Sequence, residues 1–274
     1  MNLAYLVPRL VRHFLPESVT RWLLLRSVII KPGLETDDPQ RAVDRYREFL
    51  GRRGVGFSNQ RILVFGYGGR FDVGIGLLQS GAAHVTLYDK YARPDDSHNL
   101  NLVARHPEYV TMAGGVPRPR TESLDLLESD LGLLERPPEG SRYDMVISSS
   151  VFEHVDDPAG ITRTLAGWTS PNGIHVHFVD LRDHYFKYPF EMLRYSQATW
   201  SQWLNPTSNH NRLRLWDYQR VFDSNFDRVE IEVLERDLSA FESIRSSIRP
   251  EFISGDIEAD SATLILIVAR GPRT

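Results

Sequence analysis

Residues 61–89 alternate between strand and helix patterns, and this alternation constrains the fold more than any other feature of the chain. Residues 61–65 form an apolar run of strand length, and a glycine-rich turn follows at 66–69. Residues 73–80 and 85–88 then have the patterns of a helix and a second strand. Strands that alternate with helices favour a mostly parallel, doubly wound α/β sheet.

The glycine turn and the residue that ends the second strand suggest a ligand. Gly66, Gly68 and Gly69 stand in the turn, and Asp89 follows the strand. Glycine lets the backbone approach a ligand closely, and the next helix N-terminus favours a phosphate or carboxylate. An acid about 20 residues beyond such a turn can accept hydrogen bonds from both ribose hydroxyls. The pattern predicts a nucleotide-like ligand. A tight turn that Asp89 merely caps is the alternative interpretation of the same residues.

Residues 143–158 are the second informative segment. An apolar strand over 144–148 ends in three serines, and Glu153 and His154 follow it. Asp157 and Pro158 then provide an N-cap and a first-turn proline for a helix. Because ligands bind at the carboxyl ends of strands in open α/β sheets, Glu153 and His154 are expected at that edge.

Together these segments resemble the Rossmann-like (class I) S-adenosylmethionine-dependent methyltransferases of the small-molecule, type 11-like group. The resemblance covers residues 58–180 and two final strands expected near 228–234 and 262–269. It implies a doubly wound, mostly parallel seven-stranded sheet with an antiparallel last strand, and S-adenosyl-L-methionine as the cofactor. The cofactor-binding residues that it implies are Gly66, Tyr67, Gly68, Gly69, Asp89, Lys90, Asp125, Ser148 and Ser149.

The glycine turn departs from the family pattern at two positions. Val64 stands where the family has an acidic residue, and Arg70 stands at its third glycine. These departures keep open an NAD-type oxidoreductase or nucleotide-sugar enzyme, although Phe71 also breaks the G-x-G-x-x-G pattern of that class. Residues 151–158 favour the methyltransferases, since dinucleotide dehydrogenases lack this segment. A non-catalytic binding protein that retains the fold is the third alternative.

The third strand of the sheet is the least visible in the sequence. We place it at residues 110–113, before a loop rich in Gly, Pro and Arg. The family has an acidic residue after this strand that contacts the adenine amino group. Asp125 is the candidate for that contact, with Glu122 nearly as good, and ordinary helix-capping acids are the alternative.

Candidate catalytic residues follow from the chemistry that the resemblance implies. Methyl transfer is an in-line displacement at a sulfonium carbon, so the enzyme must position the acceptor and often remove its proton. His154 and His184 leave strand ends near the expected methyl group, and a neutral imidazole is a natural base for a hydroxyl. Asp183 is the carboxylate expected to orient His184. Structural hydrogen bonding in a loop is the alternative role for either histidine.

A strand expected over 174–179 carries His175 and His177 on one face, because strand residues two apart share a face. Two histidines in this arrangement can bind a metal, yet the spacing offers no third ligand. We therefore predict no metal site and interpret them as polar residues beside a layer of helices. Metal-assisted transfer that uses the acids near His184 remains the alternative.

Residues 181–215 are predicted to form a helical, aromatic lid inserted after the fifth strand. Arginines clamp carboxylates or phosphates, and aromatic rings stack on sugars. The substrate candidates are Tyr185, Arg212, Arg214 and Trp216. Resemblance to methyltransferases of sugar and polysaccharide pathways favours a hydroxyl acceptor on a sugar or secondary metabolite. A purely structural cap with an aromatic core is the alternative.

Composition limits the remaining partners. The net charge of −4 argues against a general nucleic-acid binder, and the absence of cysteine fits a reducing, cytoplasmic location. No apolar run is long enough to span a bilayer. We predict an N-terminal helical cap or extension over 1–56 and the Rossmann-like domain over 57–274. The basic residues within 1–33 allow peripheral contact with a membrane or partner, while the oligomeric state stays open.

Overall fold

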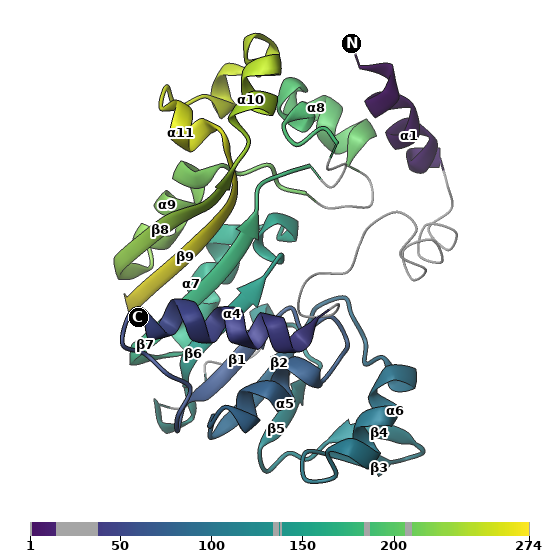
Figure 1. Ribbon diagram of the computed structural model, residues 1–274, viewed down its shortest axis with the longest axis vertical. Helices are drawn as coiled ribbons and strands as arrows, with labels where there is room; N and C mark the ends of the chain where they lie inside the picture. Colours follow the sequence, from purple (N-terminus) through teal and green to yellow (C-terminus); the bar gives the residue numbers. More distant parts are fainter. Residues whose placement is uncertain are drawn as a thin grey trace.

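The computed structural model describes residues 2–14, 38–133, 137, 139–183, 187–205 and 210–273. Its centre is a seven-stranded sheet in the order β5-β2-β1-β6-β7-β9-β8, in which β9 runs antiparallel to both neighbours (Figure 1). The predicted mostly parallel sheet with an antiparallel last strand is therefore confirmed. The strands are β1 (Arg61–Phe65), β2 (His84–Tyr88), β5 (Leu124–Leu127), β6 (Tyr143–Ser149), β7 (Thr169–Asp180), β8 (Phe226–Arg236) and β9 (Ala262–Pro272).

Helices cover both faces of the sheet because neighbouring strand residues point to opposite sides. Ile62 and Val64 of β1 belong to the core on one face, which holds apolar residues of α4 (Pro39–Gly51), α5 (Asp72–Gln79) and α6 (Asp96–Arg105). Leu63 and Phe65 belong to the opposite core, with residues of α7 (Pro158–Trp168) and α9 (Leu215–Asp223). The helix α4, predicted as part of the N-terminal extension, thus packs directly on the sheet.

The start of α7 agrees with its sequence signals. The Asp157 side chain accepts a hydrogen bond from the Gly160 amide at 2.9 Å, and Pro158 occupies the first turn. This cap satisfies one of the amides that a helix N-terminus leaves without a partner. The helix therefore begins directly beyond the carboxyl end of β6.

The predicted third strand is wrong. Residues Val110–Ala113 form β3, which pairs with β4 (Val116–Pro119) in a separate two-stranded sheet, and β5 takes the place beside β2. Leu124 of β5 is fully buried, whereas Met112 of β3 is 45% exposed. A strand of a covered parallel sheet needs apolar residues on both faces, and β3 does not provide them.

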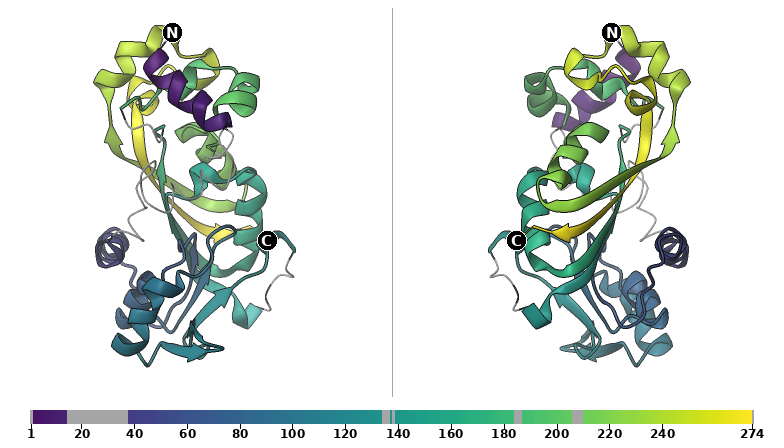
Figure 2. Two further views of the ribbon diagram at one scale, coloured as in Figure 1. Left: turned by 90° about the vertical axis from the view of Figure 1, so that its right-hand side faces the viewer. Right: turned by 90° about the vertical axis from the view of Figure 1, so that its left-hand side faces the viewer.

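A group of short helices stands at the carboxyl end of β7, and we call it the helical cap (Figure 2). Its own hydrophobic core includes Phe190, Trp200, Leu204 and Phe241, so the predicted aromatic insert does contain a packed interior. The second N-terminal helix predicted near 19–29 lies outside the described residues. The cap comprises α1 (Leu3–Phe14), η4 (Glu191–Arg194), α8 (Gln197–Thr199), η5 (Trp200–Leu204), α10 (Leu238–Ile244), η6 (Arg245–Ser247), η7 (Pro250–Phe252) and α11 (Ile257–Asp260).

Candidate active site

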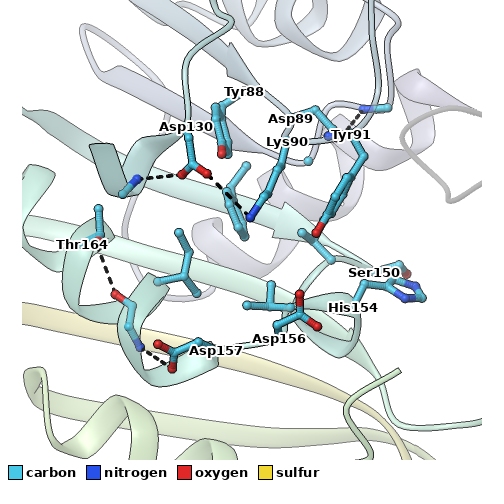
Figure 3. A pocket seen from close by; sticks show the side chains of 18 of the residues that line it. Tyr88, Asp89, Lys90, Tyr91, Asp130, Ser150, His154, Asp156, Asp157 and Thr164 are labelled. Carbon is cyan, nitrogen blue, oxygen red and sulfur yellow. Dashed lines mark hydrogen bonds and ion pairs between the residues drawn. The ribbon is translucent and has the colours of Figure 1, made fainter. Parts of the chain in front are cut away.

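A cavity of about 680 Å³ opens at the carboxyl ends of β1, β2 and β6 (Figure 3). Its size falls within the usual range of small-molecule sites, and its place is the ligand-binding edge of a doubly wound sheet. Its walls come from the ends of these strands, the connection after β5, the turn η3 (Phe152–His154) and the first turns of α7. The lining residues are Phe65, Gly66, Gly68, Tyr88, Asp89, Lys90, Tyr91, Asp130, Gly132, Ser149, Ser150, Val151, His154, Val155, Asp156, Asp157, Gly160, Ile161, Arg163 and Thr164.

The glycine turn forms one wall of the cavity. Gly66 has φ +89°, and a Cβ there would lie 2.2 Å from Val151 Cγ2. Gly69 also has φ +89°, and a Cβ there would lie 2.6 Å from the Arg93 carbonyl oxygen. Both positions therefore require glycine for conformation and for space. Gly66 and Gly68 line the cavity, whereas Tyr67 is buried against Phe71 and, like Gly69, lies outside the lining.

Asp89 joins the glycine turn to the end of β2. Its Oδ2 accepts from the Gly68 amide at 3.2 Å, and its Oδ1 accepts from the amides of Tyr91 and Ala92 at 2.9 and 2.8 Å. Asp89 therefore does cap its loop, and it also lines the cavity. A carboxylate offers about four acceptor positions, so these bonds orient it and leave capacity for a ligand.

The corrected strand order moves the acid that follows the third strand. Asp125 lies within β5, opposite Thr86 of β2, and the cavity lining does not include it among the described residues. Asp130, beyond the end of β5, does line the cavity and lies 3.6 Å from Lys90 Nζ. The sequence signal that could have pointed to Asp130 is the Leu-Asp-Leu-Leu run at 124–127, which forms β5.

Ser148 and Ser149 face opposite sides of β6. Ser149 lines the cavity and accepts a 2.6 Å hydrogen bond from Arg45 of α4. Ser150, the next residue, also lines the cavity and has φ +55°, a conformation that is uncommon for residues other than glycine. Ser148 instead points to the opposite core, where its hydroxyl lies 2.8 Å from His177 Nδ1.

His175 and His177 form a buried hydrogen-bonded chain behind β6. Thr169 Oγ1 donates to the Leu165 carbonyl and lies 2.8 Å from His175 Nε2, while His175 Nδ1 lies 3.1 Å from His177 Nε2. Because the Thr169 hydroxyl proton is already donated to Leu165, His175 Nε2 must donate to Thr169 Oγ1. The His175 Nδ1 atom then accepts from His177 Nε2, and His177 Nδ1 accepts from the Ser148 hydroxyl. Both neutral rings therefore carry their proton on Nε2. Burial lowers the pKa of His175 to about 3 and lowers that of His177 well below its usual range.

The structure describes two of the three candidate catalytic residues, and it places them in different surroundings. His154 is half-buried in η3 and lines the cavity on the side of Ser150 and Tyr91 (Figure 3). Asp183 is fully buried and accepts hydrogen bonds from Tyr5 and Arg9 of α1, so it anchors the N-terminal helix. His184 and Tyr185 lie outside the described residues, and their roles stay predictions.

Arg212 and Arg214 do not form the predicted substrate clamp. Both are buried, and their guanidinium groups donate mainly to backbone carbonyls of the cap and of its connections to the sheet. Burial lowers the pKa of both groups to about 10. Their role is to hold the connections of the cap, because buried carbonyls need donors. Trp216 is half-buried in α9 and is not among the described residues that line the cavity.

The described part of the chain lacks two features, a cluster of metal-ligating side chains and a membrane-spanning helix. It contains no group of three or more His, Cys, Asp or Glu side chains arranged to hold a metal ion. None of the helices within it has both the length and the apolar character to cross a membrane.

Comparison with known proteins relates this geometry to a family. A sequence model described as a methyltransferase domain matches residues 35–241. A putative sarcosine dimethylglycine methyltransferase from Galdieria sulphuraria is 13% identical with a TM-score of 0.52, over 93% of this chain and 98% of that one. Geranyl diphosphate C-methyltransferase from Streptomyces coelicolor A3(2) is 12% identical with a TM-score of 0.51, over 84% and 80%. Phosphoethanolamine N-methyltransferase 2 from Haemonchus contortus is 14% identical with a TM-score of 0.50, over 84% and 53%. No curated protein matches in sequence.

The family match extends over most of the chain and includes the glycine turn, Asp89 and the segment after β6. It confirms the resemblance to S-adenosylmethionine-dependent methyltransferases and favours them over the NAD-type alternative. With its sheet order and the cavity at the carboxyl edge, the chain belongs to the methyltransferase domain family.

Proposed function

We propose that the protein transfers the methyl group of S-adenosylmethionine to a hydroxyl oxygen of a small polar acceptor, such as a sugar or a secondary metabolite. The observation that carries the proposal is that Gly66, Asp89 and His154 line one cavity. Family membership provides the reaction class. The solved S. coelicolor enzyme holds S-adenosyl-L-homocysteine, and the H. contortus enzyme holds S-adenosyl-L-methionine.

The lining residues fit the cofactor. Gly66 presents bare backbone to the cavity, and Asp89 is oriented by three amides with acceptor capacity left for ribose hydroxyls. Asp130 offers a carboxylate to the adenine amino group. When bound, the cofactor supplies a methyl group that is already activated, so the chain needs to position the acceptor and manage its proton.

His154 is our proposed base for the acceptor hydroxyl. It lines the same cavity as Asp130, and Figure 3 shows the two on opposite sides of that space. This separation supports an adenine contact at the Asp130 end of the cavity and an acceptor at the His154 end. A neutral imidazole can take the hydroxyl proton near neutral pH. His184 remains a second proposed base. The cysteine-free sequence supports a reducing, cytoplasmic setting for this activity.

Calorimetry tests the cofactor first. We expect the full chain to bind S-adenosylhomocysteine and not NAD, and Asp89→Asn to weaken that binding by roughly tenfold or more, since hydrogen bonds to a charged group contribute about 1.5–3 kcal/mol. Binding of NAD in place of S-adenosylhomocysteine would overturn the proposed cofactor. A radiolabelled methyl-transfer screen over sugars and phenols then tests the acceptor class. Binding of the cofactor product with no transfer to any hydroxyl compound would overturn the acceptor proposal alone.

A further inference from the structure

The helix α1 packs on the cap through Tyr5, Leu6 and Arg9, and it leaves most of its apolar side chains on the outside. Its large apolar residues Leu3, Val7, Leu10, Val11 and Phe14 are each between 36% and 74% exposed. Their spacing places them on one face of the helix, so they form a continuous apolar stripe on the surface. A surface helix normally buries that face, and exposed apolar patches commonly mark sites of interaction.

The opposite face of α1 is fixed to the helical cap by specific polar contacts. Arg9 forms an ion pair with Asp183, donates to the Leu204 carbonyl at 2.6 Å and stacks over the Trp200 ring at 4.7 Å. Tyr5 also donates to Asp183 and stacks on the Tyr195 ring. Both Tyr5 and Arg9 are buried. Because these contacts set the rotation of the helix, its apolar stripe must face outward.

A second aromatic residue extends the stripe. The His13 ring lies 5.0 Å from the Phe14 ring and 5.3 Å from the Trp203 ring, measured between centroids. Trp203 is 46% exposed. Tryptophan and phenylalanine beside leucine and valine are the residues that enter the interface of a lipid bilayer. Figures 1 and 2 show α1 at the outer end of the molecule, beside the other helices of the cap.

Size and charge distinguish among the surfaces that could cover this stripe. A helix of 12 residues is about 18 Å long, so its stripe alone is far smaller than the roughly 800 Å² per partner of a stable dimer. With Arg9 paired to Asp183, the first 33 residues still contain four Lys or Arg against Glu17 as the single acid. A second copy would bring the same positive charge, whereas an anionic lipid surface attracts it.

We propose that α1, with Trp203, is an interfacial helix that attaches the protein to an anionic membrane surface. Its apolar stripe enters the boundary between headgroups and acyl chains, while Tyr5 and Arg9 hold the helix to the cap. The cap stands at the carboxyl end of β7, so attachment holds this end of the sheet at the membrane. The proposal is independent of the methyl acceptor.

Vesicle co-sedimentation of the full chain tests this proposal. We expect binding to vesicles of phosphatidylcholine mixed with phosphatidylglycerol, and much weaker binding to phosphatidylcholine alone or at high salt. The double variant Val7→Gln, Val11→Gln should lower the vesicle partition coefficient by roughly tenfold or more, since it removes two apolar side chains from the stripe. Glutamine favours helix at least as well as valine, so the helix is retained.

The matched control is Leu100→Gln, Leu238→Gln, which changes two exposed leucines, one in α6 and one in α10. It should bind vesicles like the wild type, and circular dichroism should report the same helix content in all three proteins. Failure of the wild type to bind anionic vesicles, or equal losses in the two double variants, would overturn the proposal. So would a wild-type dimer in sedimentation velocity that Val7→Gln, Val11→Gln dissociates, because a second copy would then cover the stripe.

Discussion

The histidine pair behind β6 makes acid stability a direct test of the structure. His175 and His177 are fully buried and linked to each other, to Thr169 and to Ser148. Burial lowers the pKa of both rings, so the folded protein keeps them neutral well below pH 6. The chain of hydrogen bonds also resists full protonation, because two charged rings would direct His175 Nδ1–H and His177 Nε2–H at each other.

The size of the effect follows from linkage. In the unfolded chain a histidine binds a proton with a pKa of about 6.5, whereas in the folded chain the buried pair stays neutral. The contribution of the pair to stability is therefore fully present above about pH 6.5 and is lost as the pH falls. Between pH 7 and pH 5 each buried neutral histidine lowers the free energy of unfolding by about 2 kcal/mol, so the pair lowers it by about 4 kcal/mol. This is a large share of the roughly 5–15 kcal/mol that stabilises a typical domain.

Urea unfolding of the wild type and of His177→Asn at pH 7 and pH 5 measures this contribution. The variant loses stability at both values through its altered hydrogen bonds, but it lacks one titrating group. Its loss between pH 7 and pH 5 should therefore be smaller than that of the wild type by about 2 kcal/mol. Carboxylates titrate alike in both proteins and cancel in the comparison. Equal losses would show that His177 titrates normally in the folded state and would refute the reasoning.

Three further predictions concern the cavity. Asp130→Ala should weaken S-adenosylhomocysteine binding by roughly tenfold or more in calorimetry, while Asp125→Ala should not, and the reverse order would return the adenine contact to Asp125. Gly66→Ala should weaken the same binding at least as strongly, because its Cβ would lie 2.2 Å from Val151 Cγ2 at φ +89°. Combining Gly66→Ala with Val151→Ala should restore binding only in part, since the positive φ at residue 66 remains. Full recovery would exclude backbone strain as a cause of the loss. His154→Gln should lower kcat by roughly 100-fold or more with unchanged product binding, and an unchanged kcat would exclude it as the base.

Local patterns in the sequence predicted much of the sheet and part of the site. The run 61–65 matches β1, and the turn after it contains the glycines that the cavity requires at Gly66 and Gly68. Asp157 and Pro158 begin α7 as predicted. Each of these features depends on residues close in sequence, where backbone preferences and capping decide the structure.

The failures involve partners far apart in the chain. The exchange of β3 for β5 depended on which short segment could bury its side chains beside β2, and sequence alone does not compare such alternatives. Arg212 and Arg214 resembled a substrate clamp, because no local pattern reveals that buried carbonyls of the cap would engage them. Asp183 bonds Arg9, 174 residues away, a contact that no local pattern indicates. Its predicted role beside His184 stays a prediction.

The sequence by itself determined the family, the order of most strands and helices, and the positions of the glycine turn, Asp89 and His154, because short-range chemistry specifies them. Tertiary structure decided which acid faces the cavity beside Lys90, how the histidine pair is satisfied, and which side of α1 faces outward. These outcomes depend on burial and on hydrogen-bond partners distant in sequence, and only the folded chain brings such partners together.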